Sequence, residues 1–519
     1  MRGRIAALVV LLLTALARPV AAAPGLEWVP CGVAAECTKI AVPLGWDAPD
    51  GPKITLAFNR HKADPAHRKG VLFVAPGVGF DFLLADVRAG VFAMFPDLLR
   101  DFDLVGVDLR GGGVHPFNGR QPAPFRSDAV ECGLPVHDPA VRSFPRTRAE
   151  VDALVRHNQA YAASCAGPSP GHLDAVTQAR DLDAVRAALG EPKVSFFFYG
   201  YTGPGQAYAS LFPHRVRAMA MDSPLDHSVP VVVRAAEYAS TVEREFGRFV
   251  AWCERSPECA LNGQDVAAVY DALLRRADRQ PVRLDLPPEP GRPQPQQATV
   301  FVRGDDLAFL TEQLLEIGDL TLPGSGTGWA DLATAIRQAA GGTSPTFAFV
   351  YRYSWGYRDL WNPLRAGQCQ DYPASVTDLA VARPLVAALA PHTRGASQAW
   401  DALSGCAGGG AAATNPPGVT VVRDAPPILL VGTQGNPWSP YGNVTRVSAQ
   451  ILGSVLLTYA GDAHIAFLSS PCVAGHIQAY LDTLALPGRD TVCPAAPVRG
   501  GDDVIATETV GAATGHRAR

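Results

Sequence analysis

The stretch that decides the fold reads Ala175-Val-Thr-Gln-Ala-Arg-Asp-Leu-Asp-Ala-Val-Arg-Ala-Ala-Leu-Gly190, and two residues later it continues as Lys193-Val-Ser-Phe-Phe-Phe-Tyr199. In the first segment apolar residues recur every three or four positions, and its final glycine is a typical helix stop. The second segment is short, apolar and rich in aromatic residues, which is typical of a buried strand. A glycine-containing turn, Gly200 to Gly205, follows it. This order predicts a helix packed beside a buried strand in an α/β fold.

Five other short segments have the same buried-strand character. They are Gly70–Ala75, Asp103–Asp108, Arg217–Asp222, Pro427–Gly432 and Ser454–Tyr459. Strands that alternate with helices in this way predict a mostly parallel central sheet with helices on both faces.

The interval between residues 226 and 424 has a different pattern. Its expected helices are Ala235–Arg255, Gln264–Arg279, Asp305–Ile317 and Ala330–Ala340, and a proline-rich link, Pro287–Gln297, interrupts them. Because the strands on either side belong to one sheet, the interval is predicted to be a helical lid inserted into it. The predicted parts are a signal peptide (1–22), the first part of the core (23–225), the lid (226–424), the C-terminal part of the core (425–495) and a flexible tail (496–519).

The composition excludes two broad classes of protein. The chain has 519 residues, of which 47% are hydrophobic and 18% charged, and its formal net charge is −4. High apolar content with low charge excludes disorder over most of the chain. The absence of a Lys/Arg cluster argues against a nucleic-acid partner. A small-molecule ligand and a monomeric chain without a cofactor are expected instead.

The N-terminal residues have the features of a secretory signal peptide. Arg2 and Arg4 precede an apolar run, Ile5 to Ala17, which small residues follow. We expect cleavage after Ala22, with Ala23 as the second choice. The run is too short to span a bilayer, and no later apolar run comes near the roughly 18 residues that a membrane span needs, so a secreted protein without a membrane span after cleavage is predicted.

Ten cysteines in an exported chain predict disulfides rather than free thiols. The sequence alone leaves their connectivity open. Nearest-neighbour pairing gives Cys31–Cys37, Cys132–Cys165, Cys253–Cys259, Cys369–Cys406 and Cys472–Cys493. The spacings are irregular and there is no Cys-x-x-Cys pair, so no metal site is expected.

Several motifs resemble the secreted tripeptidyl aminopeptidase-like branch of the α/β-hydrolase superfamily, over roughly residues 27 to 495. The motifs are Ala179–Lys193, Asp103–Gly111, Tyr208–Pro213, Gly461–Phe467 and the terminal pair Cys472 and Cys493. The resemblance implies an α/β-hydrolase fold. It also implies an exopeptidase with Ser, Asp and His in that chain order.

The segment that should carry the serine nucleophile departs from the family pattern. The family has Gly-x-Ser-x-Gly, whereas this chain has Phe198-Tyr-Gly-Tyr-Thr-Gly-Pro-Gly205. Counted forward from the strand, the serine position falls on Gly200; counted backward from the next helix, it falls on Tyr199. A third alignment makes Thr202 the nucleophile but puts Pro204 where the second glycine belongs.

The acid and the oxyanion loop also depart from the family, whereas the histidine is retained. The family's Gly-Thr-x-Asp-Pro becomes Gly432-Thr-Gln-Gly-Asn-Pro437, which puts Asn436 in the acid's place and leaves Asp462 as a possible substitute. The oxyanion loop is cut down to Ala75-Pro-Gly-Val-Gly-Phe-Asp-Phe82. His464 stands where the pattern requires the catalytic histidine.

Loss of the nucleophile removes the covalent route, so ordinary peptidase activity is not expected. The leading hypothesis is acid/base or cyclisation chemistry by His464 with Tyr201 or Asp81, on an exported and largely apolar small molecule such as a secondary metabolite. The catalytic candidates are His464, Tyr201, Asn436 and Thr202, and the substrate-binding candidates are Tyr199, Gly200, Gly79, Phe80, Asp81 and Trp438. The alternatives are a ligand-binding pseudoenzyme and a peptidase or esterase that uses Thr202.

Overall fold

The computed structural model describes residues 25–32, 34–75, 96–112, 114–115, 119–120, 126–167, 171–288, 298–316, 328–355, 358–410, 412–462 and 464–495. The predicted signal peptide and tail lie outside these residues, as do Gly79, Phe80 and Asp81 of the predicted oxyanion loop.

A ten-stranded sheet forms the centre of the described chain, in the order β1-β2-β3-β5-β4-β10-β11-β14-β15-β16. The first three neighbouring pairs are antiparallel, and the six pairs from β5–β4 to β15–β16 are parallel. The strands are β1 Val29–Gly32, β2 Ala35–Pro43, β3 Lys53–His61, β4 Gly70–Ala75, β5 Phe102–Asp108, β10 Val194–Tyr199, β11 Val216–Asp222, β14 Leu429–Thr433, β15 Val455–Tyr459 and β16 Val492–Cys493. All six predicted strands lie in this mostly parallel sheet, as expected.

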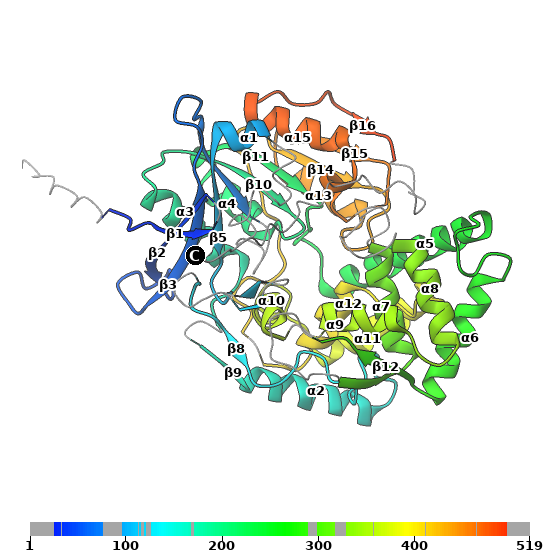
Figure 1. The fold of residues 1–519 in the computed structure, drawn as a ribbon. Coiled ribbons are helices and arrows are strands. Elements are labelled where there is room, and N and C mark those ends of the chain that lie inside the picture. The colour runs from blue at the N-terminus through cyan, green and yellow to red at the C-terminus, as the bar shows by residue number, and fades with distance from the viewer. Residues whose placement is uncertain are drawn as a thin grey trace, which may run out of the picture.

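Helices cover both faces of the sheet (Figure 1). In β10, Phe196 and Phe198 pack into one apolar cluster and Phe197 into the cluster on the opposite face. Side chains of a strand alternate between faces, so a strand covered on both sides must be apolar throughout. The covering helices are α3 Ala175–Ala188, α4 Gly203–Leu211 and α13 Tyr441–Gln450 on the first face, and α1 Pro96–Asp101, α14 Ala466–Ser469 and α15 Pro471–Thr483 on the second.

A second body of helices, with an apolar cluster of its own, is inserted between β11 and β14 (Figure 1). These two strands are neighbours in the sheet, so the chain leaves the sheet and returns to it. The inserted elements are α5 Val231–Arg255, α6 Val266–Arg279, β12 Val282–Leu286, β13 Ala298–Val302, α7 Gly304–Glu316, α8 Gly328–Ala340, α9 Pro345–Trp355, α10 Arg358–Asp371, α11 Val376–Leu389 and α12 Gln398–Cys406. The four predicted helices are confirmed; that this body acts as a lid remains a proposal.

The remaining elements lie between β5 and α3, except for one 3₁₀ turn between α4 and β11. They are β6 Val114–His115, β7 Gly119–Arg120, β8 Glu131–Cys132, α2 Arg148–Ala163, β9 Cys165–Ala166 and the 3₁₀ turn Pro213–Arg215. No helix in the described part of the chain has both the length and the apolar character that a bilayer crossing needs.

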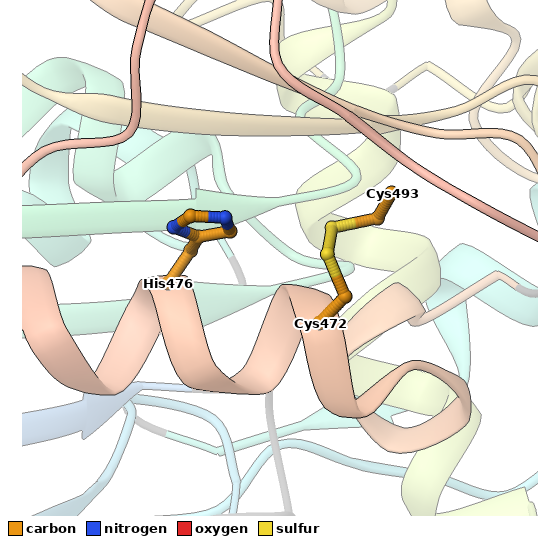
Figure 2. Close-up of side chains that lie close together, drawn as sticks. All are labelled: Cys472, His476 and Cys493. Carbon is orange, nitrogen blue, oxygen red and sulfur yellow. A yellow bond between two sulfur atoms is a disulfide. The ribbon is translucent and has the colours of Figure 1, made fainter.

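All five predicted cysteine pairs are disulfides in the structure. Figure 2 shows the last of them, Cys472–Cys493, which joins α15 to β16, with His476 beside it on the same helix. The ligand atoms of these three residues lie within 4.8 Å of one another, a spacing that a metal ion could use. Because the two sulfur atoms are bonded to each other, neither is a thiolate that could bind a metal.

Candidate functional site

The turn that follows β10 brings the chain to a sharp apex at Gly200. Its φ angle is +71°, in the left-handed region that glycine adopts without the steric cost of a Cβ atom. The Gly200 N–H donates to the carbonyl oxygen of Asp222 at 3.1 Å, and the Tyr201 N–H donates to that of Tyr199 at 2.8 Å. The helix α4 begins three residues after the apex. The geometry is therefore a tight strand-to-helix turn.

His464 lies directly over this apex. A Cβ atom built on Gly200 would be only 3.0 Å from Nε2 of His464 and 3.6 Å from its Cε1. The two residues come from loops that follow β10 and β15. Carboxyl ends of parallel strands meet at one edge of a sheet, which is why residues so far apart in sequence are neighbours here. The side chain missing at Gly200 would have pointed at the imidazole.

Asn436 lies on the other side of the imidazole. Its Oδ1 is 3.4 Å from Nδ1 of His464 and accepts hydrogen bonds from the N–H groups of Trp438 and Ser439, both at 2.9 Å. Its Nδ2 donates to Ser223 Oγ and to the His464 carbonyl oxygen, both at 3.0 Å. Both ends of the amide are therefore used. An Nδ1–H directed at Oδ1 leaves the lone pair of Nε2 facing Gly200.

The imidazole is neutral at physiological pH. Burial lowers the pKa of His464 to about 3, because the charged form loses its hydration. Asn436 has no charge with which to offset this loss, as a carboxylate in its place would. The ring of Trp438 packs against the imidazole at 5.1 Å between centroids. The site thus presents an oriented hydrogen-bond acceptor.

A carboxyl group from the helical body lies behind Trp438. Glu312 of α7 is fully buried, and burial raises its pKa to about 8, while the nearby Trp438 side chain favours the charged form. The Glu312 side chain therefore carries its proton at neutral pH. No sequence motif points to Glu312, because this residue lies in the inserted helical segment, where the resemblance to the tripeptidyl aminopeptidase-like family is weakest.

Asn436, and not Asp462, is the hydrogen-bond partner of Nδ1 of His464. The carboxylate of Asp462 pairs with Arg248 of α5, and the same guanidinium lies 3.3 Å from Oε2 of Glu245. This ion pair ties the helical body to the loop that carries His464. The role of imidazole partner, for which Asp462 was the substitute candidate, is filled in this structure by Asn436.

The side chains of Tyr201, Thr202 and Tyr199 are directed into other surroundings. The Thr202 hydroxyl is buried and accepts hydrogen bonds from the Leu225 N–H at 3.0 Å and Gln206 Nε2 at 3.2 Å. Tyr201 lines a separate cavity beside α4. Tyr199 packs against Phe467, with 5.2 Å between ring centroids. The structure thus brings together Gly200, Asn436, Trp438 and His464 from among the sequence candidates.

Comparison with known proteins gives relatives over most of the chain. Residues 391–493 match the family described as TAP-like protein. The serine protease Hip1 of Mycobacterium tuberculosis (strain ATCC 25618 / H37Rv) is 27% identical over 488 residues, which cover 88% of each chain. A tripeptidyl aminopeptidase of Streptomyces coelicolor is 25% identical over 518 residues, 92% of this chain and 88% of the relative.

These matches support a TAP-like α/β-hydrolase. The resemblance inferred from the motifs is confirmed. In this TAP-like chain the matched region contains Asn436, Trp438 and His464, whereas Gly200 lies before it. A hydrolase structure from Pseudomonas aeruginosa aligns over 89% of this chain and 100% of its own, but at 12% identity and a TM-score of 0.34 it decides nothing further.

Proposed function

We propose that this TAP-like protein is exported, lacks a covalent nucleophile, and uses His464 for acid/base or cyclisation chemistry on a small, largely apolar molecule. The observation that carries the proposal is the geometry of Gly200. The residue beneath Nε2 of His464 is a glycine, so no side-chain oxygen at this position can attack a substrate.

The hydroxyl nearest in sequence has a different task. Thr202 Oγ1 accepts two hydrogen bonds that join the turn to Leu225 and Gln206, and the residue is wholly buried. A nucleophile needs a base within hydrogen-bond reach, and the base of this site points its Nε2 at Gly200. These contacts favour a structural role for Thr202 over the esterase alternative.

His464 and Asn436 would then act directly on the bound molecule. The Nε2 lone pair accepts a proton from a substrate O–H or N–H group seated over Gly200, while Asn436 keeps the ring in position through Nδ1. A neutral amide stabilises an imidazolium poorly, so the proton must be returned to the product within the same reaction. Intramolecular proton transfer and ring closure meet this requirement.

The experiment compares the native protein with His464→Ala and His464→Gln. Each is incubated with the small-molecule fraction of the culture medium of the producing strain, and mass spectrometry follows which compounds disappear or form. We expect conversions that need the native histidine and fail in both variants. Conversion that survives in His464→Ala would overturn the mechanism.

Binding without turnover is the second candidate, and the low pKa of His464 favours it, because a base that titrates at about 3 holds a proton weakly. In the same experiment, compounds that co-purify with the native protein but remain chemically unchanged would support this candidate and refute catalysis.

A further inference from the structure

A cavity of about 230 Å³ lies beside α4, apart from the groups gathered around His464. Its walls come from the first turn of α3, one side of α4, the end of α10 and residues 415–421. Tyr201, which immediately follows the Gly200 apex, forms part of the wall. An engineered cavity of about 150 Å³ admits benzene. This cavity is therefore large enough for a substituted single-ring compound.

The cavity wall contains one charged side chain, the buried carboxylate of Asp371. Its Oδ1 accepts from Asn415 Nδ2 at 2.7 Å and from the Ala175 N–H at 3.2 Å. A carboxylate offers about four acceptor positions. Among the described residues, no hydrogen-bond donor is placed on Oδ2, so that oxygen retains capacity for a donor from a ligand.

Aromatic rings flank this carboxylate in the wall of the cavity. Tyr201 and Tyr372 both line it, and His227 packs edge-on against Tyr372 with 4.9 Å between centroids. Burial lowers the pKa of His227, which keeps its ring uncharged. Aromatic faces attract cations through the ring quadrupole, and the attraction strengthens where water is excluded.

The charges behind the wall have both signs. Arg234 lies outside the lining, with its guanidinium carbon 4.3 Å from the centroid of Tyr372. Asp174 raises the pKa of Asp371, and Asp226 raises that of Tyr372. One cation and two further carboxylates therefore surround the cavity, in addition to Asp371 itself.

The mouth of the cavity is largely apolar, with Ser210 as an exposed polar residue among Leu211, Val419 and Val421. Leu211 and Val419 line it and leave 39% and 67% of their surfaces exposed. An apolar rim around a carboxylate between aromatic rings suits a ligand that has a positive end and an apolar body. We propose that this cavity binds a small organic ammonium ion, with the ammonium on Asp371 and its apolar part between Tyr201 and the rim.

The proposal predicts how binding depends on pH. Burial and the nearby charge of Asp174 raise the pKa of Asp371, the Asn415 and Ala175 donors and Arg234 lower it, and the net pKa is about 7. The carboxyl group is therefore mostly protonated at pH 6 and mostly ionised at pH 8. Because an ammonium ion pairs with the ionised form, its affinity should rise about tenfold over this range.

The test uses calorimetric titration of the native protein with benzylammonium, which stays protonated between pH 6 and 8, and with benzyl alcohol as the uncharged analogue. We expect benzylammonium to bind about tenfold more tightly at pH 8 than at pH 6, and the affinity of benzyl alcohol to be the same at both pH values. Equal affinities, or no pH dependence, would overturn the proposal without any variant.

Variants then assign the binding to the carboxylate. Asp371→Asn keeps the size and one oxygen acceptor and should abolish the preference for the charged compound, while Asp50→Asn, an exposed loop position, should change nothing. The assignment would be contradicted if Asp371→Asn had the melting temperature of the native protein and still bound benzylammonium more tightly than benzyl alcohol. None of these measurements involves His464, so they stand apart from the proposed function.

Discussion

Replacement of Gly200 by serine should create a nucleophile in a protein that has none at this position. The Cβ atom of the new side chain would lie 3.0 Å from Nε2 of His464, so the imidazole must move by a few tenths of an ångström. From there the serine hydroxyl reaches Nε2, which already presents its lone pair. Asn436 would orient the ring as it does now.

The expected magnitudes follow from the φ angle and from the nature of the third residue. A residue with a Cβ atom at a φ of +71° costs about 1–2 kcal/mol in folding free energy. Replacing the aspartate of a serine protease triad by asparagine lowers kcat by about 10⁴-fold. With Asn436 in that place, Gly200→Ser should therefore be a slow hydrolase, about 5 kcal/mol short of a full triad in transition-state stabilisation.

The assay compares the native protein with Gly200→Ser and Gly200→Ala, using hydrolysis of p-nitrophenyl butyrate and labelling by a fluorophosphonate. Gly200→Ala is the matched control, because it has the same Cβ and backbone strain without the hydroxyl. We expect activity and one covalent adduct in Gly200→Ser alone, and loss of both when His464→Ala is added. If Gly200→Ser has the same melting temperature as Gly200→Ala but is not labelled by the fluorophosphonate, the geometry argued for this turn is wrong.

Three further predictions concern the surroundings of the site. Thr202→Val should lower the free energy of unfolding by about 1–3 kcal/mol, measured by urea titration, because the Leu225 N–H loses its acceptor; an unchanged value would contradict the structural role of Thr202. The native pKa of Glu312, raised to about 8 from 4.5, means that the folded protein holds an extra proton between these values, so native stability falls as pH rises across them. Glu312→Gln lacks this loss of stability, so the melting temperature of the variant minus that of the native protein should increase from pH 5 to pH 8. If this difference is the same at both pH values, Glu312 ionises normally. Removal of the Cys472–Cys493 disulfide by a double alanine variant should cost about 3 kcal/mol, as expected for a sequence separation of 21 residues, and a loss near zero on calorimetry would refute this.

The parallel part of the fold could be predicted from the sequence because its strands are apolar throughout. β10 and β14 are buried on both faces and stand out as continuous apolar runs. β2 gave no such signal, because the exposed residues Lys39 and Ala41 interrupt its buried residues in an antiparallel strand near the sheet edge. The helix α11 was missed as well, and Pro384 within it is a residue that usually ends a helix.

The site was predictable where one motif fixed a position and unpredictable where packing decided it. His464 followed from its motif, and Asn436 from the segment after β14. The three alignments of the turn could not be separated by sequence, because only the backbone shows that Gly200 is the apex residue beneath the imidazole. Glu312 has no local signal, since its contact with Trp438 depends on how the inserted helices dock.

The most direct test of the central claim is the intact mass of the native protein after exposure to excess fluorophosphonate. The account predicts an unchanged mass, because the residue beneath Nε2 of His464 has no side-chain oxygen and the Thr202 hydroxyl is occupied by two hydrogen bonds. A stoichiometric adduct that maps to Thr202 or to any other hydroxyl, and that His464→Ala abolishes, would contradict it.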